Sequence, residues 1–336
     1  MHAVIAFVAV FVLALIFIYL IKQFSPKLGL IDIPNERSTH VTHTPRGAGI
    51  GFFLAVVLSL ALFERQLFFD YPWTFIALFF VFIIGVLDDR HDTSPNTKFI
   101  VFIIATVFLS FDGLIINNVG TYFGVPVTLG WFALPFTMFA VSGFTNAMNL
   151  IDGIDGLAAT VSIIILGAFL IVGYRHEDMF IMTLSLFFIA ALAAFLLFNW
   201  HPASIFMGDS GSLTLGFAIS VLSIKSLDYL PTVSILFIAA LPIFDTLIVM
   251  TRRKLRGRSM FSPDRCHMHH IIKHFFREDT RKTVIFFGVL QAVYSITGLL
   301  QNKQMDEGYM MVLFLLNTLL LYMVLGAMIK RQKREC

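Results

Sequence analysis

The residues with the clearest chemical potential lie at positions 146–156, which read NAMNLIDGIDG. Amides and carboxylates recur here every three residues, between one long apolar run and the next. In a helix a step of three residues turns the side chain by only about 60°, so Asn146, Asn149 and Asp152 would point into one sector. Two interpretations are open: a solvated loop with a helix cap, or a metal or phosphate site at a membrane surface.

Two adjacent carboxylates, Asp88 and Asp89, follow an apolar run in the sequence GVLDDR. Close like charges raise the pKa of one group, which suits a general base or a metal ligand. Solvated acids at a helix end are the simpler interpretation. Lys98 precedes the next apolar run and could bind a phosphate, or it could be a boundary lysine whose charge reaches the interface.

Asp209 lies in the sequence FMGDSGS, just before another apolar run. Small and hydroxyl residues ahead of a helix leave backbone N–H groups exposed, which makes a natural anion site. Mg²⁺ prefers one or two carboxylates together with phosphate oxygens of a substrate. Asp209 with Asn149 therefore predicts a Mg²⁺ site, and a helix cap is the alternative role for Asp209.

The segment 251–282 is strongly basic, with ten Lys and Arg residues against three acids. Within six residues it holds an arginine and three histidines, namely Arg265, His267, His269 and His270. This cluster could bind a diphosphate or a metal. Asp245 lies inside the apolar run at 232–250, where an ionisable residue is a functional candidate by default and a buried interhelical contact is the alternative.

Apolar segments must position these residues. The chain has 336 residues, is 58% hydrophobic and 13% charged, and has a mean hydropathy of +0.85, which is typical of a polytopic membrane protein. A net charge of +3 is too small to imply a nucleic-acid partner, and two cysteines imply no disulfide framework. We predict a single-domain, all-α bundle of eleven transmembrane helices, at residues 1–21, 48–63, 73–87, 99–111, 131–147, 157–173, 179–198, 213–224, 232–250, 283–300 and 309–329.

Charge distribution supports this count. With the N-terminus outside, one face receives 20 of the 24 Lys and Arg residues, and the other receives only Arg65, Arg175, Lys225 and Lys303. The asymmetry predicts an inner-membrane protein whose active site faces the cytoplasm. The cytoplasmic segments are then 22–47, 88–98, 148–156, 199–212, 251–282 and the tail 330–336. On the outer side, the composition of 112–130 predicts a small hairpin.

Read together, the motifs resemble the polyprenyl-phosphate N-acetylhexosamine-1-phosphate transferase family. They occur in the family's order over roughly residues 22–282, as PNERSTH, TPRGAG, GVLDD, NAMNLIDGIDGLA, FMGDSGS, LPIFDT and FSPDRCHMHH. The resemblance implies a Mg²⁺-dependent phosphotransferase in the lipid bilayer, with Mn²⁺ as an alternative metal. Its substrates would be a UDP-N-acetyl-sugar and undecaprenyl phosphate, its by-product UMP, and its role the initiation of a cell-surface polysaccharide such as O-antigen.

The resemblance also implies a role for each candidate residue. Asp209 is similar to the family's magnesium-binding aspartate, with Asn149 as its co-ligand. Asp88 and Asp89 are similar to the paired acids that act on the lipid phosphate or near the metal. The positions implied to bind substrate are Asn146, Asp152, Asp155, Lys98, Arg265, His267, His269 and His270.

Several alternatives stay open from the sequence. The first loop is closer to relatives that transfer 6-deoxy-N-acetylhexosamines, whereas SPDRCHMHH is closer to relatives that use N-acetylglucosamine, which is our first expectation. A transporter is the alternative from another class, although only Asp245 lies within an expected span. A di-iron desaturase would need several histidine clusters, and the sequence has one. The sequence leaves open whether the chain forms a homodimer.

Overall fold

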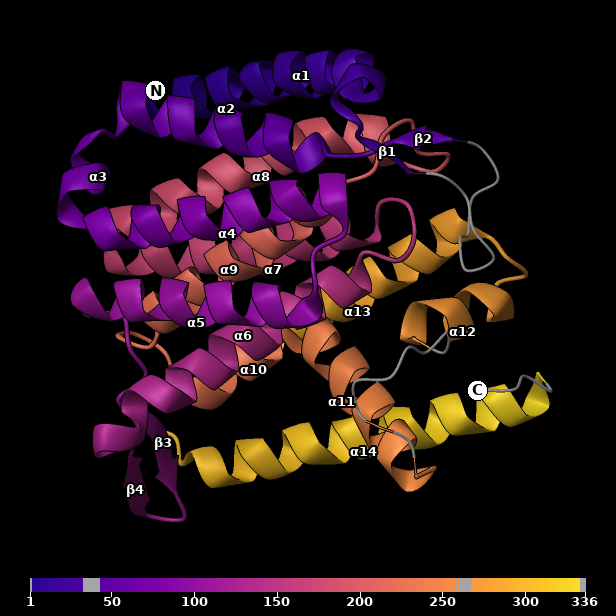
Figure 1. Cartoon of the computed structure of the whole chain (residues 1–336). Coiled ribbons are helices and arrows are strands. Elements are labelled where there is room, and N and C mark those ends of the chain that lie inside the picture. Colours follow the sequence, from indigo (N-terminus) through magenta and orange to yellow (C-terminus); the bar gives the residue numbers. More distant parts are fainter. Residues whose placement is uncertain (1, 33–42, 258, 260–266, 333–336) are drawn as a thin grey trace.

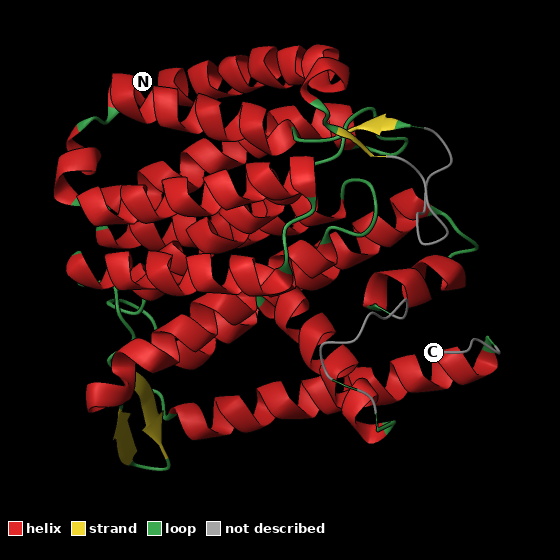
Figure 2. Ribbon diagram, in the orientation of Figure 1, coloured by secondary structure: helices red, strands yellow, loops and turns green. Residues whose placement is uncertain are grey.

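The computed structural model describes residues 2–32, 43–257, 259 and 267–332, which form a helical bundle with two small antiparallel sheets (Figures 1 and 2). The helices are α1 (His2–Leu28), α2 (Ala48–Phe63), α3 (Gln66–Asp70), α4 (Pro72–His91), α5 (Pro95–Phe111), α6 (Ala133–Ile151), α7 (Leu157–His176), α8 (Met179–Asn199), α9 (Asp209–Ser226), α10 (Thr232–Ile238), α11 (Ala240–Leu255), α12 (Met268–Phe275), α13 (Thr280–Leu299) and α14 (Glu307–Arg331). The sheets pair β1 (Ile31–Asp32) with β2 (Thr44–Pro45), and β3 (Asn118–Tyr122) with β4 (Val125–Thr128). The hairpin expected within residues 112–130 is therefore confirmed.

Each predicted apolar run corresponds to a helix, except that the run at 232–250 is divided between α10 and α11. Among the described residues, six helices are long and apolar enough to cross a membrane, or seven if the bent pair α10–α11 counts as one span. These features confirm an all-α multi-pass membrane protein. The count of eleven spans stays a prediction.

The break between α10 and α11 bends the chain by 87°. Pro242 lacks an N–H, so it cannot donate to the carbonyl of Ile238 one turn earlier. Gln291 and Ser295 of α13 donate to this carbonyl instead, at 2.7 and 3.0 Å. The side-chain amide oxygen of Gln291 also accepts from the N–H of Leu241 at 3.1 Å. Irregular backbone persists inside an apolar bundle only when its polar groups find such partners.

Helix α9 lies at the centre of the bundle and buries 15 of its 18 residues. Glycines allow its neighbours to approach its first turn closely. A Cβ on Gly85 of α4 would lie 2.6 Å from the carbonyl oxygen of Asp209, and a Cβ on Gly49 of α2 would overlap the backbone of Gly211. Because a side chain at either position would collide with the backbone of α9, these two glycines allow α2 and α4 to pack against its first turn.

The connections gather at two opposite ends of the bundle (Figure 1). One end carries β3, β4 and the short helix α3. The other end carries β1, β2 and α12, together with the end of α4 and the start of α5 (Figure 1). Most of the sequence-predicted site residues belong to this second end.

Candidate active site

Lys98 lies between two of the predicted aspartates. Its Nζ is 2.7 Å from Oδ2 of Asp88 and 2.6 Å from Oδ2 of Asp209. Thr93 fixes the Asp88 carboxylate, because its N–H and its hydroxyl both donate to Oδ1, at 2.8 and 2.6 Å. The end of α4, the first turn of α5 and the first residue of α9 thus meet in one acid–lysine–acid arrangement.

Asp89 makes different contacts from its neighbour. Its Oδ1 accepts the N–H of Asp209 at 2.7 Å, its Oδ2 accepts the N–H of Ser210 at 3.0 Å, and the residue is 2% exposed. Asp89 therefore caps α9 from another helix, since these first N–H groups have no partner within α9. Gly208 makes the approach possible, because a Cβ there would lie 2.6 Å from Oδ1 of Asp89. The motif of two adjacent acids did not predict that Asp88 and Asp89 would have different partners.

Asn149 is the second residue that holds the Asp209 side chain. Its Nδ2 donates to Oδ1 of Asp209 at 2.9 Å and to the hydroxyl of Ser212 at 2.8 Å. The amide nitrogen of Asn149 makes both of these hydrogen bonds, so the amide oxygen points away from the Asp209 carboxylate. Asn146 lies one turn earlier on α6 and is half-buried.

Asp152 follows directly after α6 and is half-buried. Burial, together with the negative charges of Asp209, Asp155 and Asp89, raises the pKa of Asp152 to about 7. A carboxyl group whose pKa is raised by burial and by neighbouring carboxylates is a candidate for a functional site.

Asp155 organises the loop between α8 and α9. Its Oδ2 lies 2.7 Å from Nδ1 of His201 and accepts the N–H of Ala203 at 3.0 Å. Arg281 then donates from Nε and Nη2 to the His201 carbonyl, at 3.0 and 2.9 Å. His201 is not among the residues predicted from the sequence, where its one signal is its place seven residues before Gly208 in segment 199–212.

Asp245 of α11 anchors the start of the histidine helix α12. Its Oδ2 lies 2.6 Å from Nδ1 of His267, and its Oδ1 accepts the N–H of Met268 at 2.6 Å. The carboxylate is 2% exposed, so it is a buried partner of the histidine cluster. Arg265, the arginine of this cluster, lies outside the described residues.

His269 connects the histidine cluster to the loop that carries Asp152. A Cβ on Gly153 would overlap its Nε2, and its ring lies 5.7 Å from the ring of His267 and 4.2 Å from the ring of His270. Burial lowers the pKa of His269 to about 3, so the imidazole is neutral at physiological pH. In the described part of the chain, neither of its ring nitrogens has a hydrogen-bond partner.

The first loop reaches the same end of the bundle. The N–H of Phe206 donates to the Pro45 carbonyl at 2.8 Å, and the N–H of Gly49 donates to the Met207 carbonyl at 2.9 Å. The motif TPRGAG therefore lies directly against FMGDSGS, although the two are more than 150 residues apart. Residues 33–42, which include all of PNERSTH, lie outside the described residues.

The donor set fits a divalent cation whose coordination is completed by a substrate. Among the residues the structure describes, no three His, Cys, Asp or Glu side chains form a metal cluster by themselves. The carboxylate of Asp209 could supply one ligand, and the amide oxygen of Asn149 could supply a second once the amide turned this oxygen toward the carboxylate. The negative charges of Asp209, Asp155 and Asp89 around Asp152 favour a cation at this place. Mg²⁺ commonly takes one or two carboxylates and fills its other positions with water and phosphate oxygens.

Comparisons with known proteins find related sequences over most of the chain. The sequence profile of glycosyl transferase family 4 matches residues 71–227. A probable undecaprenyl-phosphate N-acetylglucosaminyl 1-phosphate transferase of Bacillus subtilis (strain 168) is 33% identical over 93% of this chain and 88% of its own. The undecaprenyl-phosphate alpha-N-acetylglucosaminyl 1-phosphate transferase of Yersinia pestis is 31% identical over 97% and 91%, and that of Escherichia coli (strain K12) is 28% identical over 92% and 87%.

Proposed function

Because this chain belongs to glycosyl transferase family 4 and is a membrane sugar-phosphate transferase, we propose that it transfers N-acetylglucosamine-1-phosphate from UDP-N-acetylglucosamine to undecaprenyl phosphate. The acceptor and the sugar follow the names of its relatives in Bacillus subtilis and Yersinia pestis. UMP leaves, and the product starts a cell-surface polysaccharide. The active site faces the cytoplasm from the inner membrane, as the distribution of Lys and Arg predicts. Membership of this family favours a transferase over the transporter and desaturase alternatives.

The observation that carries this proposal is the bridge from Lys98 to Asp88 and Asp209 at one end of the bundle. Phosphoryl transfer needs charge neutralisation and positioning more than it needs a protein nucleophile. A site with one lysine and several carboxylates at an apolar boundary supports a reaction between two phosphate-bearing substrates and a divalent cation.

The reaction exchanges one phosphorus–oxygen bond for another. An oxygen of the lipid phosphate attacks the β-phosphorus of the UDP-sugar, and the bond from this phosphorus to the bridging oxygen breaks. The electron pair of that bond leaves with UMP, and the sugar remains attached to the transferred phosphate. Asp209 and Asn149 would hold Mg²⁺, or Mn²⁺ in its place, which supplies positive charge to the diphosphate.

Asp88 and Lys98 would prepare the lipid phosphate. Thr93 and Lys98 hold the Asp88 carboxylate in place, so it can accept the remaining proton of the incoming phosphate or orient the group. The Lys98 ammonium can exchange one carboxylate partner for a phosphate oxygen, and its positive charge then still has a negative partner. Asp89 acts indirectly, since its carboxylate binds the backbone N–H groups of Asp209 and Ser210 and so positions Asp209.

The nucleotide and the sugar would bind beside the α6–α7 loop and the histidine cluster. Contact between Gly153 and His269 brings these two segments together. The residues proposed to face this substrate are Asn146, Asp152, Asp155, Arg265, His267, His269 and His270. In this group Asp155 and His267 already have partners, His201 and Asp245, so they would shape the pocket through the loops that they hold.

A membrane assay tests the proposal. Membranes containing the protein are given undecaprenyl phosphate, Mg²⁺ and either UDP-N-acetylglucosamine or a UDP-6-deoxy-N-acetylhexosamine, each labelled in the sugar. We expect labelled lipid and UMP in equal amounts with the first donor and much less with the second. Preferential use of the 6-deoxy donor would overturn the sugar assignment. UMP release that does not depend on undecaprenyl phosphate would overturn the acceptor.

A further inference from the structure

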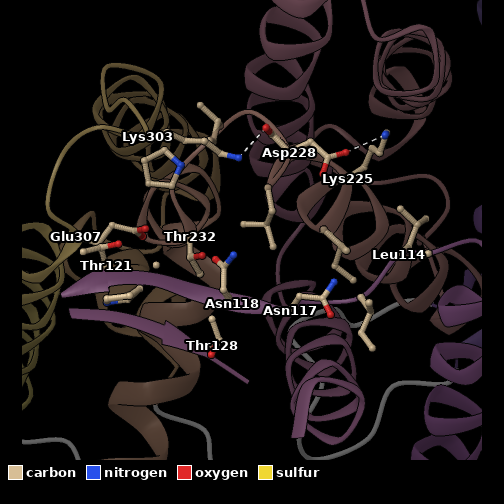
Figure 3. A pocket seen from close by; sticks show the side chains of 18 of the residues that line it. Leu114, Asn117, Asn118, Thr121, Thr128, Lys225, Asp228, Thr232, Lys303 and Glu307 are labelled. Atoms are coloured by element: carbon tan, nitrogen blue, oxygen red, sulfur yellow. Dashed lines mark hydrogen bonds and ion pairs between the residues drawn. The ribbon is translucent and has the colours of Figure 1, made fainter. Parts of the chain in front are cut away.

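The end of the bundle opposite to the acids contains a polar cavity of about 480 Å³ (Figure 3). Its walls come from Tyr71 and from three longer segments: residues 112–128 with the hairpin β3–β4, residues 224–232 from the end of α9 to the start of α10, and residues 303–307 before and at the start of α14. A volume of this size lies in the range of small-molecule sites and is far larger than an ion needs.

The walls present uncharged hydrogen-bonding groups. Two amides and three hydroxyls line the cavity, on Asn117, Asn118, Thr121, Thr128 and Thr232. Amides and hydroxyls can both donate and accept hydrogen bonds, so they match ligands that are rich in hydroxyl groups. Tyr71 is the one aromatic residue among the lining residues, which makes a nucleobase or an apolar ligand a poor match.

The carboxylates of this cavity are already engaged, which argues against a metal site. Asp228 pairs with Lys225 at 2.9 Å, and Glu307 accepts the N–H of Val233 at 2.8 Å. Asp112 accepts both the N–H and the hydroxyl of Thr74, each at 2.7 Å.

The two lysines that line the cavity, Lys225 and Lys303, differ in their partners. Lys225 forms ion pairs with Asp228 and Asp178, at 2.9 and 3.6 Å. Lys303 donates only to the backbone carbonyl of Asp228, at 2.7 Å, and forms no ion pair within the described ranges of the chain (Figure 3). Lys225 and Lys303 are also two of the four cations that the sequence places on the outer face. Lys303 thus offers one positive charge to an anionic group.

The walls are held in place before any ligand arrives. Asp306 accepts the N–H groups of Phe123 and Gly124 at 2.9 and 2.7 Å, which fastens the turn between β3 and β4. The carboxylate of Glu307 packs under Gly120, where a Cβ would overlap it. A preformed cavity loses little conformational entropy when it binds a ligand.

We propose that this cavity binds a saccharide with a single acidic group, whose hydroxyls meet the amides and threonines and whose acid meets Lys303. A phospholipid headgroup shares the anionic chemistry. It matches the cavity less well, because a phosphate would use one unpaired cation and leave the amide- and hydroxyl-lined wall unused. The proposal is independent of the transferase reaction at the other end of the bundle.

Binding of two matched disaccharides tests the proposal. The full-length protein in phosphatidylcholine nanodiscs is titrated with cellobiose and with cellobiouronate, which differ by one carboxylate. We expect saturable binding of both and tighter binding of cellobiouronate. Lys303→Gln should weaken cellobiouronate at least five-fold and cellobiose less than two-fold. Asn118→Phe, which fills the cavity, should abolish both.

Arg65→Gln is the matched control, because Arg65 is an exposed cation predicted on the same face but outside the cavity. It should bind both sugars as the wild type does, and all variants should keep the wild-type melting temperature. Absence of saturable binding by either sugar, or equal binding by the wild type, Lys303→Gln and Asn118→Phe, would overturn the proposal. Glycerophosphoglycerol that binds through Lys303 where cellobiouronate fails would identify a lipid-headgroup site instead.

Discussion

The carboxylate of Asp89 accepts the backbone N–H of Asp209 at 2.7 Å, so the Asp89 side chain binds the main chain of Asp209 and not its side chain. The same carboxylate accepts the N–H of Ser210, which fixes the first turn of α9. Asp209 can face Lys98 and Asn149 only while that turn is held. The motif of two adjacent acids therefore combines a residue of the site, Asp88, with a residue that positions the site.

We predict that Asp89→Asn lowers both stability and turnover. The new amide would direct N–H groups at a backbone N–H, and a buried donor without an acceptor costs about 1–3 kcal/mol. Asp88→Asn is the matched comparison, and it should reduce turnover with a smaller loss of stability. Melting temperature and UMP release are measured for both variants. An Asp89→Asn protein that melts like the wild type but is inactive would show that Asp89 has a chemical role instead.

Asp209→Asn should abolish turnover, because it removes the charge proposed to hold the metal and raises the barrier by several kcal/mol. Removal of divalent cations with EDTA should abolish wild-type activity, and Mg²⁺ should restore it. Ser212→Ala removes a neighbouring partner of Asn149 and leaves the charge, so it should cost only a few-fold in rate. Near-normal incorporation of labelled sugar by Asp209→Asn would remove Asp209 from the metal site.

Much of this architecture could be read from the sequence. Apolar runs predict helices in a membrane protein, since a helix satisfies its backbone groups internally. Charge asymmetry grouped Asp88, Asn149 and Asp209 on one face, and in the structure Asp209 contacts Asn149 directly and is linked to Asp88 through Lys98.

Other features depend on tertiary contacts that no local pattern encodes. The different tasks of Asp88 and Asp89 follow from which groups of α5 and α9 lie opposite each carboxylate. The pairing of Asp155 with His201 likewise depends on how the loop after α8 folds back. Pro242 is a local signal of the break in the ninth apolar run, but Gln291, which binds the freed carbonyl, lies on another helix.

Stability should depend on pH through Asp152. Because its folded-state pKa is raised to about 7, above the ordinary value of 3.8, the folded protein holds this proton more tightly than the unfolded chain. Without divalent cations, the stability contributed by this more tightly held proton of Asp152 is fully present below about pH 4. It is lost as the pH rises toward 7. Thermal melting in EDTA between pH 5 and 8 should therefore show a smaller decline for Asp152→Asn than for the wild type. Equal slopes for the two proteins would contradict the raised pKa.

Asp245 and His267 should behave as a coupled pair. Each single change to Asn disrupts the short contact between the two buried groups, so the double variant should lose less free energy of unfolding than the sum of the two single variants. We expect a coupling free energy of about 1–3 kcal/mol by denaturant unfolding. His274 and Glu278 provide an exposed control pair at 2.9 Å, for which the coupling should be below about 1 kcal/mol. Additive effects of Asp245→Asn and His267→Asn would show that the contact does not hold α12.

Gly153→Ala tests whether the histidine cluster closes against the Asp152 loop. Its methyl group would overlap Nε2 of His269, so α12 or the loop must move, which costs about 1–3 kcal/mol. We expect a higher KM for the UDP-sugar and a lower melting temperature. Gly143→Ala is the matched control, since its Cβ would meet nothing within 4 Å and alanine favours the helix. If both variants keep wild-type KM and melting temperature, His269 does not pack on Gly153 in the working enzyme.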